Sequence, residues 1–125
     1  MRHVSRKSPD PILKSAKDPA LTNKVNITGT LSTLFPAMDG GARKLVFASS
    51  AAVYGFPDTF PVREDFLPRS ESLCAVTKIL GEEYCRLFDE FYGLKTVSLR
   101  YFNFYGPRQG RPEDEGVRRV HALLT

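Results

Sequence analysis

Side chains able to exchange protons or to bind phosphate gather in three short stretches of this sequence. The stretches are Ser49–Gly55 (SSAAVYG), Cys74–Lys78 (CAVTK) and Arg100–Arg108 (RYFNFYGPR). Hydroxyl and thiol groups can pass a proton to a substrate oxygen, and arginine can bind phosphate through two parallel hydrogen bonds. In a helix, Cys74 and Lys78 would share one face, because residues four apart are one turn apart. These stretches are therefore the candidates for a reactive site.

Two helices are predicted beside these stretches. Apolar residues spaced by three and four predict a helix over 19–35, with Asp18 as its N-cap. Pro36 is expected to kink or end that helix, since proline lacks a backbone donor. The same spacing predicts a second helix over 72–92, which Gly93 ends.

Two strands and two loops complete the pattern. Short apolar runs predict buried strands at 44–49 and 95–100. Residues 50–70 contain several prolines and are expected to form a loop, of a length that usually carries function. A further glycine- and proline-bearing loop follows the second strand, and a third helix is predicted from about residue 113.

The alternation of helix and strand predicts an α/β fold. Strands separated by helices run parallel, which gives half of a doubly wound, Rossmann-like sheet, over residues 18–125. Residues 1–17 are basic and contain two prolines, so we expect an irregular arm there. Ligands of such sheets bind beyond the carboxyl ends of the strands. The site is therefore expected at residues 49–60 and 101–111, together with side chains of the second predicted helix.

The composition fits one small globular domain and excludes several classes of protein. The chain has 125 residues, with 42% hydrophobic and 26% charged residues. No apolar run approaches the roughly 18 residues of a membrane span, and no apolar leader opens the chain. The net charge of +4 is concentrated in the arm without interleaved aromatic residues, so we expect a solvated segment and no nucleic-acid partner.

The two cysteines indicate a reducing compartment and no metal site. Cys74 and Cys85 lie eleven residues apart in the predicted helix. That spacing corresponds to roughly 16 Å of helix, whereas a disulfide needs Cα atoms within about 7 Å. Neither cysteine has a metal-ligand spacing to the histidines, His3 and His121. We therefore expect free thiols, no bound metal and a cytoplasmic protein.

Together with Val25–Thr30 (VNITGT), the three stretches resemble the extended short-chain dehydrogenase/reductase family. The subgroup resembled is that of NAD-dependent sugar-nucleotide epimerases and dehydratases, most closely its UDP-glucose 4-epimerase type. The resemblance runs from about residue 15 to residue 111. It implies a Rossmann-like nucleotide-binding domain of which this chain holds the second half, NAD as cofactor, and a nucleotide sugar as substrate.

The resemblance also implies roles for individual residues. It implies catalytic roles for Ser50, Cys74 and Lys78, cofactor contacts for Asn26, Ser50, Lys78 and Phe102, and substrate contacts for Ser50, Asn103 and Arg108. Three of these assignments have an alternative from the residue type alone. Asn26 could instead satisfy nearby backbone groups of its helix, Asn103 could be a turn former, and Arg108 could be a solvated loop residue.

Cys74 stands where the family carries a tyrosine that exchanges a proton with the substrate hydroxyl. A thiol is acidic enough for this role, with a free pKa of about 8.5 against about 10 for tyrosine. The thiol sulfur, however, lies one bond beyond Cβ, whereas the phenol oxygen lies across a ring. Cys74 is therefore expected to be a poor proton donor or simply a small buried thiol, and Tyr54 and Tyr84 are the nearest other phenols in the sequence.

Two further departures bear on the reaction. Sugar-nucleotide 4,6-dehydratases place an Asp-Glu pair after the catalytic serine or threonine, but this chain has Ala51 and Ala52, which cannot move a proton. Epimerisation at C4 is therefore favoured over elimination. The sequence also lacks a Gly-x-x-Gly-x-x-Gly string, the family's pyrophosphate cradle. We therefore expect an internal fragment with impaired activity and no measurable NAD binding by the chain alone; the alternative is a catalytically inactive remnant or interaction module.

An apolar stripe on each predicted helix suggests self-association. On the second helix the stripe comprises Val76, Leu80, Tyr84, Leu87 and Phe91, with Phe88 beside it. By resemblance, the helices at 19–35 and 72–92 would pack against their copies in a second chain. A homodimer is therefore expected.

Overall fold

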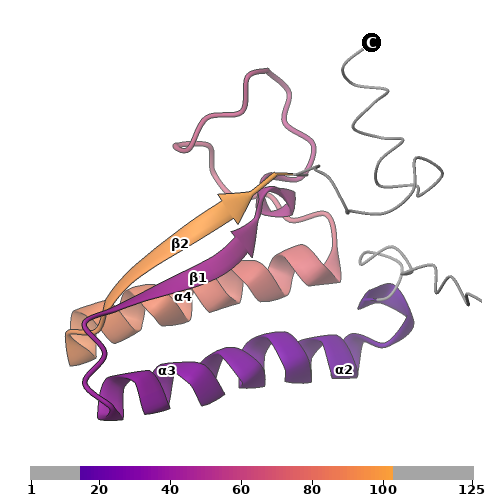
Figure 1. Ribbon diagram of the computed structural model, residues 1–125. Helices are drawn as coiled ribbons and strands as arrows, with labels where there is room; N and C mark the ends of the chain where they lie inside the picture. The colour runs from indigo at the N-terminus through magenta and orange to yellow at the C-terminus, as the bar shows by residue number, and fades with distance from the viewer. Residues whose placement is uncertain (1–14, 103–125) are drawn as a thin grey trace, which may run out of the picture.

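The computed structural model describes residues 15–102, a helix and strand mixture with a parallel sheet (Figure 1). Its elements in chain order are α2 (Pro19–Asn23), the π-helical η1 (Lys24–Thr28), α3 (Gly29–Asp39), β1 (Lys44–Ser50), the 3₁₀ turn η2 (Ala51–Tyr54), α4 (Leu73–Tyr92) and β2 (Lys95–Tyr101). Residues 15–17 are also helical, so the predicted irregular arm ends earlier than expected. They contain neither glycine nor proline, and nothing in them breaks a helix. Residues 1–14, and the helix predicted from residue 113, lie outside the described residues.

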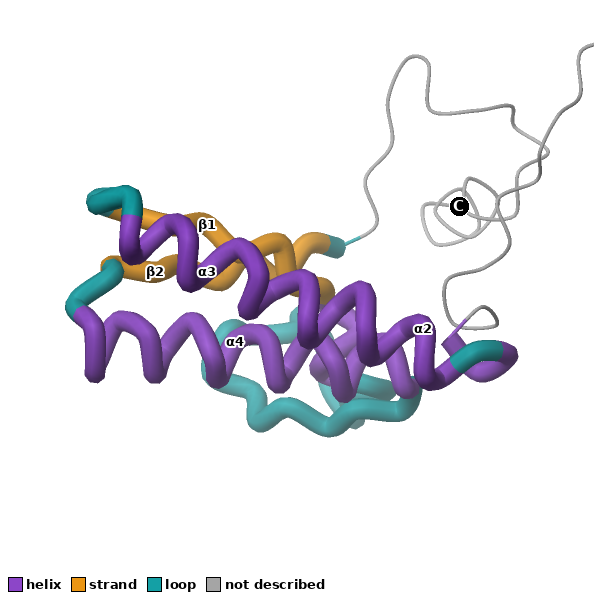
Figure 2. Tube along the Cα trace, turned by 90° about the horizontal axis from the view of Figure 1, so that it is seen from below, coloured by secondary structure: helices purple, strands orange, loops and turns teal. Residues whose placement is uncertain are grey.

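The two strands pair in parallel, as predicted. Their register runs from Lys44 opposite Lys95 to Ser50 opposite Tyr101. Both strands are one residue longer than predicted, and α4 connects them across one face of the sheet. Figure 2 shows α3 and α4 side by side on that same face. The arrangement is a partial Rossmann-like fold, and the carboxyl ends of both strands meet at one edge of the sheet.

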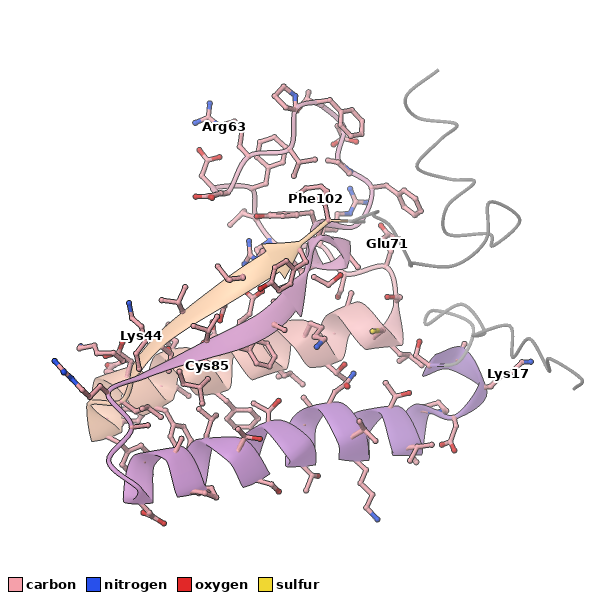
Figure 3. The ribbon with its side chains drawn as sticks, viewed as in Figure 1. Lys17, Lys44, Arg63, Glu71, Cys85 and Phe102 are labelled. Atoms are coloured by element: carbon pink, nitrogen blue, oxygen red, sulfur yellow. The ribbon has the colours of Figure 1, made fainter. Side chains whose placement is uncertain are left out.

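The hydrophobic core lies between the two helices and the covered face of the sheet. Its buried members are Leu34, Cys85, Phe88 and Leu94. Leu45 and Phe47 of β1 pack against them, and the rings of Phe35 and Phe88 meet edge to face at 5.1 Å. Both cysteines are free thiols, as their spacing predicted, and Cys85 lies between α4 and the sheet (Figure 3).

The first predicted helix begins where expected but continues past its proline. The carboxylate of Asp18 accepts a hydrogen bond of 2.9 Å from the backbone N–H of Leu21, which confirms it as the N-cap. Of the two outcomes expected at Pro36, a kink or an end of the helix, the end is wrong, since α3 runs to Asp39. Proline leaves only the carbonyl of Ser32 without its helical donor, and Ser32 is exposed, so that water can bind there.

Helix α4 matches its prediction closely, but the predicted apolar stripe is not the face that packs inside. Ser72 caps its start through the N–H of Ala75, and Gly93 ends it with a positive φ of 73°. The buried positions are Ala75, Thr77, Gly81, Cys85 and Phe88. Val76, Leu80 and Phe91 of the stripe are exposed, whereas Phe88 belongs to the core. Among residues 15–102, none of the helices has the length and apolar character needed to cross a bilayer.

The segment after β1 is partly ordered into η2 rather than being loop from residue 50. Ser50 initiates this turn, and Val53 and Tyr54 are buried in it. The loop that follows is closed at its base, because the N–H of Arg69 donates to the carbonyl of Val53 at 2.9 Å. Gly55 has a φ of 64° and lies so close to Arg69 that a Cβ there would collide with the Arg69 carbonyl.

Replacement of Gly81 by alanine should destabilise the fold. A Cβ at this position would collide with the Phe47 ring, which packs beneath α4. Forcing the ring aside should lower the free energy of unfolding by about 1–3 kcal/mol, the usual cost of overpacking. Urea unfolding followed by circular dichroism measures the change.

Gly29→Ala is the matched control, because a Cβ there meets nothing within 4 Å. Alanine in a helix should raise the free energy of unfolding by about 0.5–1 kcal/mol. A Gly81→Ala protein as stable as the Gly29→Ala protein would contradict the close contact between α4 and Phe47.

Candidate functional site

Lys78 lies against the carboxyl end of β1. Its Nζ donates a hydrogen bond of 2.8 Å to the carbonyl of Ala48, two residues before Ser50. The same ammonium lies over the Phe47 ring, 5.2 Å from its centroid. An ammonium has three donors, so this anchor leaves two for other groups. A helix residue and a strand end predicted to belong to one site are therefore brought together.

Ser50 is held by the turn that it initiates. Its Oγ accepts a hydrogen bond of 3.2 Å from the backbone N–H of Ala52, as the N-cap of η2. A hydroxyl has one proton to donate and two lone pairs. The cap occupies one lone pair, and the hydroxyl can still donate to another oxygen.

Cys74 occupies the turn of α4 before Lys78 and is half-buried. Its carbonyl accepts a hydrogen bond of 2.8 Å from the hydroxyl of Thr77. That hydroxyl in turn accepts a bond of 2.8 Å from the side-chain amide of Asn26, in the π-helical segment η1. The Asn26 amide therefore joins the first helix to α4 and does not satisfy its own backbone, the alternative that the residue type left open.

The rings of Tyr54 and Tyr84, the nearest other phenols in the sequence, are packed within the fold. Tyr54 is buried, and the guanidinium of Arg100 stacks over its ring at 4.8 Å. Tyr84 packs against the hydrophobic core from α4. Both rings are thus engaged in packing contacts.

Glu82 is the centre of a network that sequence reasoning missed. Its carboxylate accepts hydrogen bonds from the Nε and one terminal nitrogen of Arg100, at 3.0 and 2.7 Å, and one from the hydroxyl of Ser49. Burial alone would raise the pKa of Glu82, but the hydrogen bonds from Arg100 and Ser49 outweigh it and hold that pKa below its ordinary value. The available signal was spacing, since Glu82 lies one turn after Lys78 on the same face of α4.

The second strand brings Phe102 to the same edge. It follows Tyr101, the strand partner of Ser50, and its side chain is exposed (Figure 3). Asn103 and Arg108, the predicted substrate contacts, lie outside the described residues.

A cavity of about 340 Å³ opens beside Lys78, between the first helix and the outer edge of β1. Asn26, Lys78 and Ala48 bound its polar side, and Val25, Leu34 and Val46 contribute apolar walls.

Comparison with known proteins gives the family. A profile of the NAD dependent epimerase/dehydratase family matches residues 11–124. The chain belongs to this family. Its relatives include the UDP-glucose 4-epimerase of Mycolicibacterium smegmatis, 35% identical over 117 residues, which are 91% of this chain and 37% of that protein. This epimerase/dehydratase chain spans about a third of the length of the curated relatives that it matches.

Solved structures of this family have the same fold. UDP-glucose 4-epimerase of Thermus thermophilus, in complex with NAD, is 41% identical with a TM-score of 0.76, over 90% of this chain and 36% of that one. UDP-N-acetylglucosamine 4-epimerase of Methanobrevibacter ruminantium M1, in complex with UDP-N-acetylmuramic acid, is 32% identical with a TM-score of 0.79, over 95% and 39%. NAD is the family's cofactor, and the relatives bind UDP-sugars.

The donors among the described residues are compatible with the hydroxyl groups of the predicted cofactor. Lys78 has two ammonium donors left beside a cavity with polar and apolar walls, and the hydroxyl of Ser50 lies at the end of β1. Among residues 15–102 no glycine-rich turn opens a helix toward this site, so the part described holds no cradle for the pyrophosphate.

Acid should weaken the fold through Glu82. A carboxyl whose pKa is lower in the folded than in the unfolded chain adds stability that is fully present above the unfolded pKa, about 4.3. This stability is lost as the pH falls through the lower, folded-state pKa. Glu82→Gln should therefore reduce the free energy of unfolding by about 1.5–3 kcal/mol at pH 7, the usual value for a hydrogen bond to a charged group.

The pH dependence separates Glu82 from other carboxylates. The deficit of Glu82→Gln relative to the natural chain should shrink between about pH 5 and pH 3, measured by urea unfolding. Glu83→Gln is the control, since Glu83 is exposed and pairs only with exposed Arg86. A deficit independent of pH would show that the charge of Glu82 is not what stabilises the network.

Proposed function

We propose that this chain carries the proton-transfer part of an NAD-dependent nucleotide-sugar 4-epimerase site, with UDP-hexoses as the substrate class and with activity impaired at Cys74. The observation that carries the proposal is the hydrogen bond of Lys78 to Ala48. It fixes the ammonium two residues from Ser50 and one helical turn from Cys74. The family relation and the UDP-sugar complexes of relatives support the same assignment.

In 4-epimerisation the C4 hydroxyl of the sugar is oxidised to a ketone and then reduced from the opposite face. Hydride acceptance and return at C4 is the chemistry that bound NAD supplies. Ser50 is suited to hydrogen-bond the C4 oxygen, because its hydroxyl proton is not used by its cap. Lys78 places positive charge where it would stabilise a negative oxygen of the substrate.

Cys74 is the weak point of this arrangement. It occupies the turn before Lys78, where the family tyrosine would exchange the C4 hydroxyl proton. A thiol cannot reach as far as a phenol, and a displacement of about 1 Å can cost about 10²-fold in rate. A water molecule between thiol and sugar would be needed to complete the transfer.

Elimination chemistry is disfavoured at the same site. Dehydration requires an acid and a base directly after Ser50, and those positions are Ala51 and Ala52 in η2. Their methyl groups neither donate nor accept protons. Epimerisation needs no such pair.

The second candidate is a catalytically inactive protein that keeps this part of the fold. Cys74, in place of the family tyrosine, favours it. The two candidates differ in whether restoration of the phenol restores turnover.

Cys74→Tyr should raise epimerase activity by about 10²-fold or more, the contribution of a positioned proton donor. Because the chain spans about a third of its relatives, the assay uses a chimera in which residues 15–102 replace the matching segment of the Thermus thermophilus epimerase. Interconversion of UDP-glucose and UDP-galactose is measured with NAD present.

Cys74→Phe is the matched control, because it fills the same space without a hydroxyl. A gain with tyrosine alone assigns the effect to the phenol. Equal activities of the unsubstituted, Cys74→Tyr and Cys74→Phe chimeras would refute the epimerase proposal for this segment and favour the inactive protein.

We also propose that the chain forms a homodimer through its two long helices. Leu21, Val25 and Phe35 are exposed on the first helix, as are Val76, Leu80 and Phe91 on α4. Figure 2 shows these helices side by side, covering the sheet with one face and leaving the opposite face outward. Burial of one such side chain contributes about 1.5–3 kcal/mol, so a few suffice for pairing.

Phe91→Glu should shift the dimer toward monomer at micromolar concentration, measured by light scattering. Phe91 is 68% exposed and therefore dispensable for the core. Phe56→Glu is the control, because Phe56 is 79% exposed on the loop rather than on the helices. A monomeric natural chain, or equal effects of both substitutions, would be inconsistent with this interface.

A further inference from the structure

One carboxylate, that of Glu82, connects α4 to both strands. Ser49 of β1 and Arg100 of β2 are partners in the sheet register, and both donate hydrogen bonds to it. Arg100 binds with two nitrogens, a geometry that fixes orientation as well as distance. The contact thus sets the rotation of α4 about its axis relative to the strand pair.

The members of this network adjoin the proposed site residues. Ser49 precedes Ser50, Arg100 comes two residues before Phe102, and Glu82 lies one helical turn after Lys78. Side chains alternate along a strand, and the hydrogen bonds of Ser49 and Arg100 to Glu82 place both on the face that α4 covers. The Glu82 network therefore fixes the ends of both strands through contacts on the face of the sheet that α4 covers.

The network also reaches η2. The guanidinium of Arg100 stacks on the ring of Tyr54, and Tyr54 closes the turn that Ser50 caps. Ser50 is thereby fixed from two sides, through Ser49 within β1 and through Tyr54 at the end of its turn.

Stability alone does not account for this pair. The side chains of Glu82 and Arg100 are only 14% and 22% exposed. Such pairs lose most of their electrostatic gain to desolvation, and apolar residues of similar volume are often at least as stabilising. What the pair adds is a directional link between three elements.

We propose that Glu82 and Arg100 are positioning residues that hold Ser50 and Phe102, at the ends of the two strands, in place relative to Lys78 on α4. Their importance for turnover rests on the proposed epimerase function. Their effect on geometry does not, and it can be measured on the full chain without substrate.

The test compares amide ¹H–¹⁵N spectra of the full chain and of Glu82→Gln, with Glu83→Gln as the neighbouring control. Ser50, Tyr54 and Phe102 report on the strand ends, and none is near residue 82 in sequence. Leu34 and Leu94 report on the core. We expect Glu82→Gln to displace the three strand-end signals and leave the two core signals in place, and Glu83→Gln to move neither set.

Arg100→Lys keeps the positive charge without the two-pronged geometry, and should displace the Ser50 and Tyr54 signals as Glu82→Gln does. If Glu82→Gln does not fold, the spectrum of Arg100→Lys tests the positioning role in its place. Unmoved strand-end signals, core signals displaced to the same extent, or unfolding of both variants would overturn the proposal, since the pair would then be a general stabilising element.

The second test of the proposal measures the kinetics of the Cys74→Tyr chimera. Glu82→Gln in that chimera should lower kcat by about 10²-fold, as for a displacement of about 1 Å, with little change in KM. An inactive chimera would count against the epimerase function alone, because the spectra still decide the positioning role. An active chimera whose kcat is unchanged by Glu82→Gln would overturn the role in turnover.

Discussion

Helix α4 approaches the sheet closely only because residue 81 has no side chain. The Phe47 ring occupies the space that a Cβ of Gly81 would need. Lys78 and Glu82 flank Gly81 on the same side of the helix, and both reach the strands, one at a β1 carbonyl and the other at a side chain of each strand. A wider separation would put both polar contacts out of range. The packing of one aromatic ring against one glycine thus sets the distance on which the site depends.

The same packing makes the fold one-sided within residues 15–102. Both long helices lie on one face of the sheet, and Val46, Val97 and Leu99 are exposed on the other. Parallel sheets are ordinarily covered on both faces. The core that stabilises the described part of this chain is therefore small and lies on one side of the sheet. This is why a single contact such as that of Gly81 with Phe47 is expected to have a measurable effect on unfolding.

Local sequence patterns predicted the secondary structure correctly where a single residue or a short apolar run determines where an element begins or ends. The short apolar runs form β1 and β2 with one residue added to each, and Gly93 ends α4 as expected. Lys78, predicted to share a site with Ser50, reaches the end of β1 through the carbonyl of Ala48. Pro36 does not end its helix, because a proline near a helix end removes only one backbone hydrogen bond, and the exposed carbonyl that loses its donor can bind water instead. The links made by Asn26 and by Glu82 join residues 18 to 51 positions apart, and only the folded chain shows them.

The contacts of Asn26 and Glu82 are relevant to the choice between an epimerase that carries Cys74 and a catalytically inactive protein. The described contacts around the proposed site are formed with a cysteine at position 74: Lys78 is anchored, Ser50 caps its turn, and the Asn26 amide donates to a hydroxyl of α4. The ion pair of Glu82 with Arg100 of β2 is present although apolar residues of the same volume would often contribute as much to stability. A chain whose only requirement was to fold would not need charges there. The described geometry is therefore compatible with the proposed epimerase site, in which a thiol stands at the position of the phenol.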